Sequence, residues 1–162
     1  MLEMAFTKKL PNRTMDSTQT YIFDLDGTLS DSALLTVEAF RLAVPGSGLP
    51  EPTIEAIWAA NGYPVPEFYE LIYPSFPTEK VHALGERVYE TELCILPDFR
   101  WELLFPGVRE LLIELKNQGK NLFIVSTGSP EHVDSLLDHS GIHCFFEAIF
   151  CGEADKAGMI GR

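Results

Sequence analysis

Short apolar runs that alternate with helical patterns constrain the fold of this chain most strongly. Three such runs occur, TYIFDL at residues 20–25, NLFIVS at 121–126 and EAIFCG at 147–152. They are rich in β-branched and aromatic residues, and each ends in a turn, as is typical of buried strands in a parallel sheet. Strands that alternate with helices predict an α/β core with right-handed crossovers.

A helix is expected after each of the first two runs and again before the second. The helix that opens at Pro106 and Gly107 has an apolar face formed by Val108, Leu111, Leu112 and Leu115, and Gly119 is expected to end it. Pro130 is expected in the first turn of the helix that follows the second run. Three strands would form a thin sheet with an exposed edge, so we expect a sheet that is incomplete at the C-terminus or needs a partner.

Residues 32–100 contain helical patterns and no convincing strand. The breaks fall at the proline- and glycine-rich segments PGSGLPEP and PSFP. We therefore expect a flexible tail at residues 1–19, an α/β core formed by residues 20–31 and 101–162, and an inserted helical subdomain at 32–100. The aromatic residues Trp58, Tyr63, Phe68 and Tyr69 are expected to fill the core of that subdomain.

The composition limits the expected partners. A formal net charge of −12 repels nucleic acid and anionic membranes, and neither is expected to bind. A phosphorylated ligand would need a local positive centre, such as a cation, a lysine or oriented backbone N–H groups. The three cysteines are odd in number and form no CxxC motif, and no apolar run is long enough to span a membrane, so we expect a reduced, cytoplasmic location.

Two aspartates, Asp24 and Asp26, follow the first apolar run in the sequence DLDGT. Ligands of open α/β sheets bind at the carboxyl ends of strands, where these carboxylates are expected. Two close carboxylates repel each other, and a hard cation such as Mg²⁺ relieves that repulsion. A carboxylate can also act as a nucleophile and form an aspartyl-phosphate. The alternative is that both aspartates only cap the turn and the next helix.

The run IFDLDGTLSDS resembles the first motif of the haloacid dehalogenase superfamily, in its branch of phosphoglycolate-phosphatase-like and β-phosphoglucomutase-like proteins. The resemblance extends from about Thr20 to the end of the chain. It implies a Rossmann-like three-layer core with residues 32–100 as a helical cap. It also implies that Asp24 is the nucleophile and Asp26 the general acid/base, and that the Asp24 carboxylate and the Asp26 backbone carbonyl bind Mg²⁺.

Two further segments are similar to later motifs of this superfamily. NLFIVSTGSP is similar to the strand that ends in a phosphate-binding hydroxyl, which implies Ser126 in that role, with the N–H groups of Thr127 and Gly128 as helpers. Thr127 is the alternative hydroxyl if the strand ends one residue later. Lys156 resembles the lysine that neutralises the nucleophile and the phosphate. Considered alone, STGSP fits many turns, and a lone lysine is usually a solvated surface charge.

The acidic fourth motif of the superfamily has no counterpart after Lys156, so the chain resembles a family member truncated before that motif. The resemblance implies a Mg²⁺-dependent phosphatase acting on a small phosphorylated metabolite, with unknown oligomeric state. The alternatives are a phosphomutase, which returns the phosphoryl group to a sugar phosphate, and a catalytically inactive interaction module.

Other charged residues are not expected to act in the site. The cations of the expected cap, Arg41, Lys80, His82 and Arg87, are interpreted as surface residues. The spacing of His132, His139 and His143 does not match a compact set of metal ligands.

Overall fold

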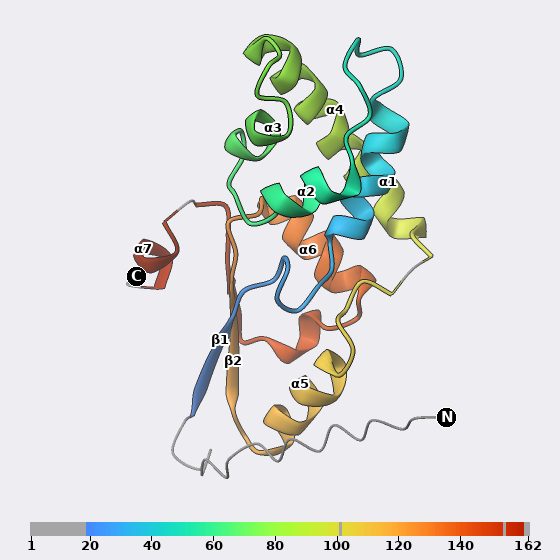
Figure 1. Ribbon diagram of the computed structural model, residues 1–162. Helices are drawn as coiled ribbons and strands as arrows, with labels where there is room; N and C mark the ends of the chain where they lie inside the picture. The colour runs from blue at the N-terminus through green and yellow to red at the C-terminus, as the bar shows by residue number, and fades with distance from the viewer. Residues whose placement is uncertain (1–18, 101, 154, 161–162) are drawn as a thin grey trace, which may run out of the picture.

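The fold is that of a computed structural model, which describes residues 19–100, 102–153 and 155–160 (Figure 1). Apart from Gln19, the tail predicted at residues 1–19 lies outside these ranges. The elements run in this order: β1 Thr20–Phe23, α1 Ala33–Ala43, α2 Ile54–Ala60, α3 Glu67–Ile72, α4 Thr78–Ile95, η2 Leu96–Asp98, α5 Val108–Asn117, β2 Asn121–Val125, α6 Pro130–His139, η3 His143–Phe145, β3 Ala148–Phe150 and α7 Lys156–Ile160.

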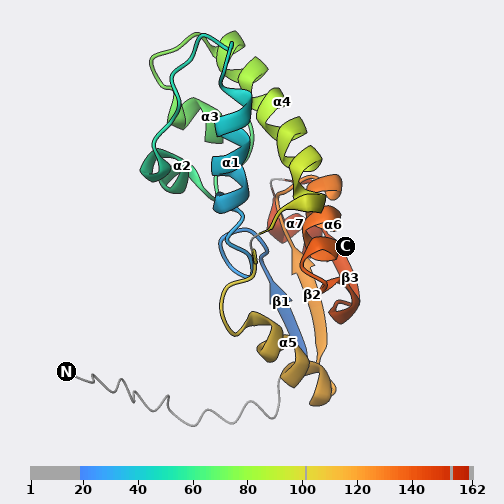
Figure 2. The ribbon, with the colours of Figure 1, turned by 90° about the vertical axis from the view of Figure 1, so that its right-hand side faces the viewer.

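The three strands form one parallel sheet in the order β1-β2-β3, which confirms the predicted α/β core. Ile22 pairs with Phe123, and Ile124 pairs with Ile149. The backbone carbonyl of Gln19 accepts a hydrogen bond from the N–H of Asn121 at 2.8 Å, at the N-terminal end of the β1–β2 pair. Helices α5 and α6 lie on one side of the sheet and α7 on the other, which gives the core its layers (Figures 1 and 2).

The first strand is less buried than its sequence predicts. The strand order places β2 in the centre, where Leu122 and Ile124 are fully buried, whereas β1 lies at an edge of the described sheet. Ile22 of β1 is 47% exposed, so the expectation of a buried strand is wrong for this residue. An apolar run predicts that a strand forms, but the order of strands in the sheet decides how much of that strand is buried.

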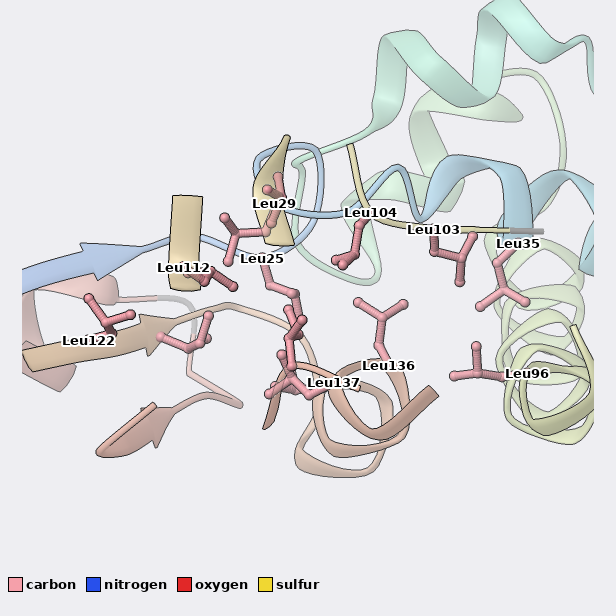
Figure 3. Packing of buried hydrophobic residues seen from close by; sticks show 14 of the residues in the cluster. Leu25, Leu29, Leu35, Leu96, Leu103, Leu104, Leu112, Leu122, Leu136 and Leu137 are labelled. Atoms are coloured by element: carbon pink, nitrogen blue, oxygen red, sulfur yellow. The ribbon is translucent and has the colours of Figure 1, made fainter. Parts of the chain in front are cut away.

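Leucines dominate the core between the sheet and its helices (Figure 3). Leu25 follows β1, Leu112 comes from α5, and Leu136 and Leu137 come from α6; all four are fully buried. The predicted apolar face of α5 is confirmed at Val108, Leu112 and Leu115 but is wrong at Leu111, which is 40% exposed. The turn after α5 is made at Gly119, which has φ = 71° and suits a residue without a side chain.

Helices α1 to α4 form a cap over one end of the α/β core (Figures 1 and 2). The cap has its own apolar cluster, in which Phe40 of α1, Val88 of α4 and Tyr69 of α3 are buried together. Helices α1 and α4 also reach the apolar cluster of the α/β core. Leu35 of α1 is part of that cluster, and Ile95 of α4 packs against both clusters. Cap and core are therefore connected by continuous helices as well as by loops.

Two aromatic residues of the cap do not fill its core as expected. Trp58 is 55% exposed and Tyr63 is 49% exposed, whereas Tyr69 is buried and Phe68 packs against the cap cluster. The short helix α2 presents Trp58 outward, because Ile57 and Ala60 lie on its buried side.

All three cysteines are free thiols. No helix within the described ranges is both long enough and apolar enough to cross a membrane.

Candidate active site

The loop after β1 holds the two aspartates of DLDGT in a fixed arrangement. The side chains of Leu25 and Leu29 are buried in the core and anchor the loop from below. The carbonyl of Leu25 accepts hydrogen bonds from the N–H groups of Leu29 and Ser30 at 2.9 and 3.0 Å. Gly27 has φ = 71°, which an L-residue adopts only with strain, and a Cβ there would approach the Asn61 side chain of the cap. The loop thus turns sharply beneath the cap.

Asp24 and Lys156 meet at the carboxyl end of β1. The Nζ atom of Lys156 lies 2.7 Å from Oδ2 of Asp24, although the two residues are far apart in the sequence. The other carboxylate oxygen, Oδ1, accepts a hydrogen bond from the N–H of Leu25 at 2.9 Å. The Asp24 side chain keeps 38% of its surface exposed, so this carboxylate is held in place and is still accessible.

Asp26 forms an ion pair with a histidine of α6. Nε2 of His132 lies 3.1 Å from Oδ1 of Asp26, and both side chains are largely buried. Burial alone would raise the pKa of Asp26, but the hydrogen bond and charge of His132, with smaller contributions from Ser32 and Lys156, hold it below its usual value. Burial alone would lower the pKa of His132, but Asp26 and Glu92 raise it to about 9. At neutral pH the pair is therefore a carboxylate and an imidazolium.

The cap helix α4 places a buried carboxyl group and a hydroxyl group near this pair. Glu92 is only 7% exposed, and its Oε1 accepts a hydrogen bond from the Thr36 hydroxyl at 2.6 Å. Burial raises the pKa of Glu92, against smaller opposing effects of His132 and Thr36. The hydroxyl groups of Tyr89 and Ser129 share a hydrogen bond of 2.6 Å between α4 and the start of α6. Contacts between cap and core therefore surround His132.

The predicted phosphate-binding residues follow β2. The N–H of Ser126 still donates to Phe150 of β3, which makes Ser126 the first residue after the strand. Its hydroxyl is buried and accepts a hydrogen bond from the N–H of Gly128 at 3.0 Å. The Gly128 N–H, expected to face an anion, thus already has a partner within the protein. Thr127 is less buried than Ser126 and lines the cavity described next.

A cavity of about 790 Å³ lies between the cap and the α/β core. Asp26, Thr127, Gly128 and His132 form part of its core side, and residues of α3, α4 and the loop before α3 form its cap side. Of the cap cations considered from the sequence, only His82 contributes to the lining. Arg41 instead pairs with Glu38 on the cap surface, and Arg87 donates to the carbonyl of Pro45.

His132 and Glu92 are the site residues that sequence reasoning missed. A local signal for His132 was available, because Ser129 caps α6 and Pro130 begins it, which places His132 in the first turn beside the carboxyl ends of the strands. No comparable signal pointed to Glu92, which comes near His132 only through the packing of α4 on α1 and α6.

The donor atoms present fit a magnesium ion only in part. Within the described ranges no group of three or more histidine, cysteine, aspartate or glutamate side chains is placed to hold a metal ion. Magnesium commonly binds through one or two carboxylates together with water and substrate phosphate oxygens. The accessible Asp24 carboxylate and the loop backbone at Asp26 suit such a site, in which much of the coordination shell comes from ligand and solvent.

Comparison with known proteins identifies the family. The family model of haloacid dehalogenase-like hydrolases matches residues 21–157. The tyrosine-protein kinase PtkA of Mycobacterium tuberculosis is 32% identical over 145 residues, which cover 86% of this chain and 46% of PtkA. The phosphoglycolate phosphatase of Pseudomonas syringae pv. tomato is 29% identical over 159 residues, which cover 93% of this chain and 54% of that protein.

The fold agrees with this result. A crystal structure of a predicted phosphoglycolate phosphatase from Haemophilus somnus 129PT matches with a TM-score of 0.75 at 21% identity, and the match covers 87% of this chain and 65% of that chain. The chain spans about half the length of the curated relatives it matches. From the family model and the shared fold together, this chain belongs to the haloacid dehalogenase-like hydrolases.

Proposed function

We propose that this chain carries the nucleophile and acid/base side of the active site of a Mg²⁺-dependent phosphatase that acts on a small phosphorylated metabolite. The observation that carries the proposal is the pairing of Asp24 with Lys156 at 2.7 Å, beside the pair of Asp26 with His132. An accessible carboxylate next to a lysine suits attack on a phosphate ester, because the lysine offsets the repulsion between two anions.

In the first step, Oδ2 or Oδ1 of Asp24 forms a bond to phosphorus while the bond from phosphorus to the ester oxygen breaks. The ammonium group of Lys156 stabilises the negative charge on the transferring phosphoryl group. The Ser126 or Thr127 hydroxyl donates a hydrogen bond to a phosphoryl oxygen, and the N–H groups of Thr127 and Gly128 add to this once the Gly128 N–H leaves Ser126. The product is an aspartyl-phosphate on Asp24 and a free alcohol.

Asp26 acts as the general acid in the first half-reaction and as the general base in the second. It delivers a proton to the departing ester oxygen in the first. In the second it removes a proton from the water that attacks phosphorus, while the bond between Asp24 and phosphorus breaks, inorganic phosphate leaves and the Asp24 carboxylate is restored. The lowered pKa of Asp26 favours its carboxylate form, which suits the removal of a proton from water. For the first half-reaction the proton comes from the pair with His132, whose Nε2 is 3.1 Å from Oδ1 of Asp26.

Mg²⁺ would be held by the Asp24 carboxylate and the Asp26 backbone carbonyl, and when bound it neutralises charge on the phosphoryl oxygens. The division into a tail at 1–19, a core at 20–31 and 101–162 and a cap at 32–100 is part of the same proposal, as is a cytoplasmic location.

A phosphomutase has to accommodate a sugar bearing a second phosphate. The cavity lining in the described residues contains no lysine or arginine for that phosphate, so we favour the phosphatase.

The proposal is tested by Asp24→Asn. We expect this variant to lose release of inorganic phosphate from p-nitrophenyl phosphate in the presence of Mg²⁺, because an amide cannot form the acyl-phosphate. Asp98→Asn, an equal change at an exposed position, should retain activity. A second readout needs no turnover: beryllium fluoride with Mg²⁺ should raise the melting temperature of the wild type but not of Asp24→Asn. Equal turnover or equal protection in wild type and Asp24→Asn would exclude Asp24 as the nucleophile.

A further inference from the structure

The cavity between cap and core has an acidic lining. Asp26, Glu86 and Glu92 line it, whereas no lysine or arginine does so among the residues that the structure describes. Glu86 lies on α4 and is exposed. In the proposed reaction Lys156 offsets the negative charge of the substrate phosphate at the aspartate loop. Asp24 and Lys156 do not line the cavity, but Asp26, Thr127 and Gly128 do, so the cavity adjoins the proposed phosphate position and can hold the remainder of a substrate.

Glu86 is the exposed charge of this lining, because Asp26 is paired with His132 and Glu92 is buried and hydrogen-bonded to Thr36. Nε2 of His82 lies 3.0 Å from Oε1 of Glu70, and Nε2 of His132 lies 3.1 Å from Oδ1 of Asp26. Each imidazole is thus already paired with a carboxylate of the protein. A carboxylate on the substrate would find no unpaired cation here and would be repelled by Glu86.

The cap side of the cavity is also aromatic. Tyr63, Phe68, Tyr69 and Tyr89 contribute to it, together with Pro64 and Val65. Tyr63 is about half exposed, so an aromatic surface is open to a ligand. Aromatic rings bind apolar groups, and their faces also attract ammonium ions. A volume of about 790 Å³ lies in the range of pockets for ligands much larger than a two-carbon acid.

From the acidic and aromatic lining we infer that this site selects phosphate monoesters of aromatic or otherwise apolar alcohols. The alcohol is uncharged or carries an amine. The site discriminates against phosphoglycolate and other esters whose alcohol carries a carboxylate. The inference rests on the proposed phosphatase function, because it names the substrate class of that same site. It differs from the activity in the name of the Pseudomonas syringae relative, a phosphoglycolate phosphatase.

Matched aryl phosphates test the selectivity with little change in the leaving oxygen. The substrates are the phosphate esters of tyramine, 4-ethylphenol and 4-hydroxyphenylacetate, which differ mainly in the charge at the far end of the ring, with phosphoglycolate as a fourth. We expect kcat/KM to be about tenfold or more higher for the tyramine ester than for the 4-hydroxyphenylacetate ester. The 4-ethylphenol ester should lie between them, and phosphoglycolate should be the poorest.

Glu86→Lys tests the origin of the selectivity. The variant should narrow or reverse the ratio between the amine and carboxylate esters, because it replaces the exposed negative charge of the cavity with a positive one. Glu79→Lys is the matched control: it makes the same change on the same helix, outside the cavity lining, and should keep the wild-type ratio. An unchanged ratio in Glu86→Lys, or an equal change in Glu79→Lys, would remove the cavity as the source of selectivity.

The affinity of the free phenols, measured by calorimetry, tests this inference independently of the proposed function, because binding needs no turnover. Tyramine should bind about tenfold or more tightly than 4-hydroxyphenylacetate, and Glu86→Lys should reverse the order. If no ester is hydrolysed but this order holds, the phosphatase proposal fails and the selectivity of the cavity stands. If 4-hydroxyphenylacetate binds as well as tyramine, or neither phenol binds, the inference is overturned whether or not esters are hydrolysed.

Discussion

The protonated state of His132 depends on the folded structure. Its pKa of about 9 lies above the ordinary value of 6.5, so this histidine stabilises the fold fully below pH 6.5. That contribution declines as the pH rises and is lost above about 9. The pKa of Asp26 is lowered, so the contribution of Asp26 is present above its ordinary value of 3.8 and is lost as the pH falls below it. The pair is therefore most stabilising between about pH 4 and 6.5.

His132→Gln should lower the free energy of unfolding by on the order of 3 kcal/mol at pH 6, because each unit of pKa difference corresponds to about 1.4 kcal/mol. The deficit should shrink toward pH 9.5. Urea denaturation at pH 6, 7.5 and 9.5 in EDTA measures it. His143→Gln removes an exposed pair with Asp138 and should have little effect at any of these pH values. A deficit for His132→Gln that stays constant with pH would contradict the assigned ion pair.

At the residue scale, the sequence predicted which groups of its local motifs lie at the carboxyl end of β1, and their roles stay a prediction. Asp24 and Asp26 sit in DLDGT, and the structure places Lys156 beside the first of them. It did not predict the partners that tertiary packing supplies. Glu92 reaches the surroundings of His132 only because α4 packs against α1 and α6, and no spacing in the sequence records that contact.

At the scale of elements, the close approach of α3 to α4 depends on a glycine. Gly85 lies in the middle of α4, where alanine would favour the helix by about 1 kcal/mol. A Cβ at this position, however, would lie 2.8 Å from Cδ2 of the buried Tyr69 ring. Because that ring is enclosed by the cap cluster, it cannot move aside without disturbing its neighbours.

Gly85→Ala should therefore destabilise the protein by about 1–2 kcal/mol, since overpacking outweighs the gain in helix propensity. Urea denaturation gives the value. The companion change Ala83→Gly, at an exposed position of the same helix, should cost about 1 kcal/mol through propensity alone. Tyr69→Leu should relieve much of the penalty when it is combined with Gly85→Ala. Stabilisation by Gly85→Ala would show instead that the ring yields easily.

The helices could be predicted because their signals are local. The helical patterns predicted within residues 32–100 appear as helices α1 to α4, and Pro130 begins α6 as expected. Burial was harder to predict, because it depends on the order of strands and on neighbouring elements. Ile22 is exposed since β1 lies at an edge of the described sheet, and Trp58 is exposed since α2 buries other residues.

At the scale of the whole molecule, the net charge of −12 opposes compaction. Several ion pairs among the described residues, such as Arg41 with Glu38, lie at the surface and add little to the stability of the fold. Screening of these pairs by salt should therefore cost little stability. Raising NaCl from 10 to 300 mM should therefore screen more repulsion than attraction. We expect the melting temperature to rise by about 2–4 °C, the change that about 1 kcal/mol produces in a protein of this size. Glu79→Lys reduces the net charge from −12 to −10 and should show a smaller rise. Differential scanning calorimetry measures both, and a fall with salt would mean that attractive pairs, not the acidic excess, dominate the electrostatics of the fold.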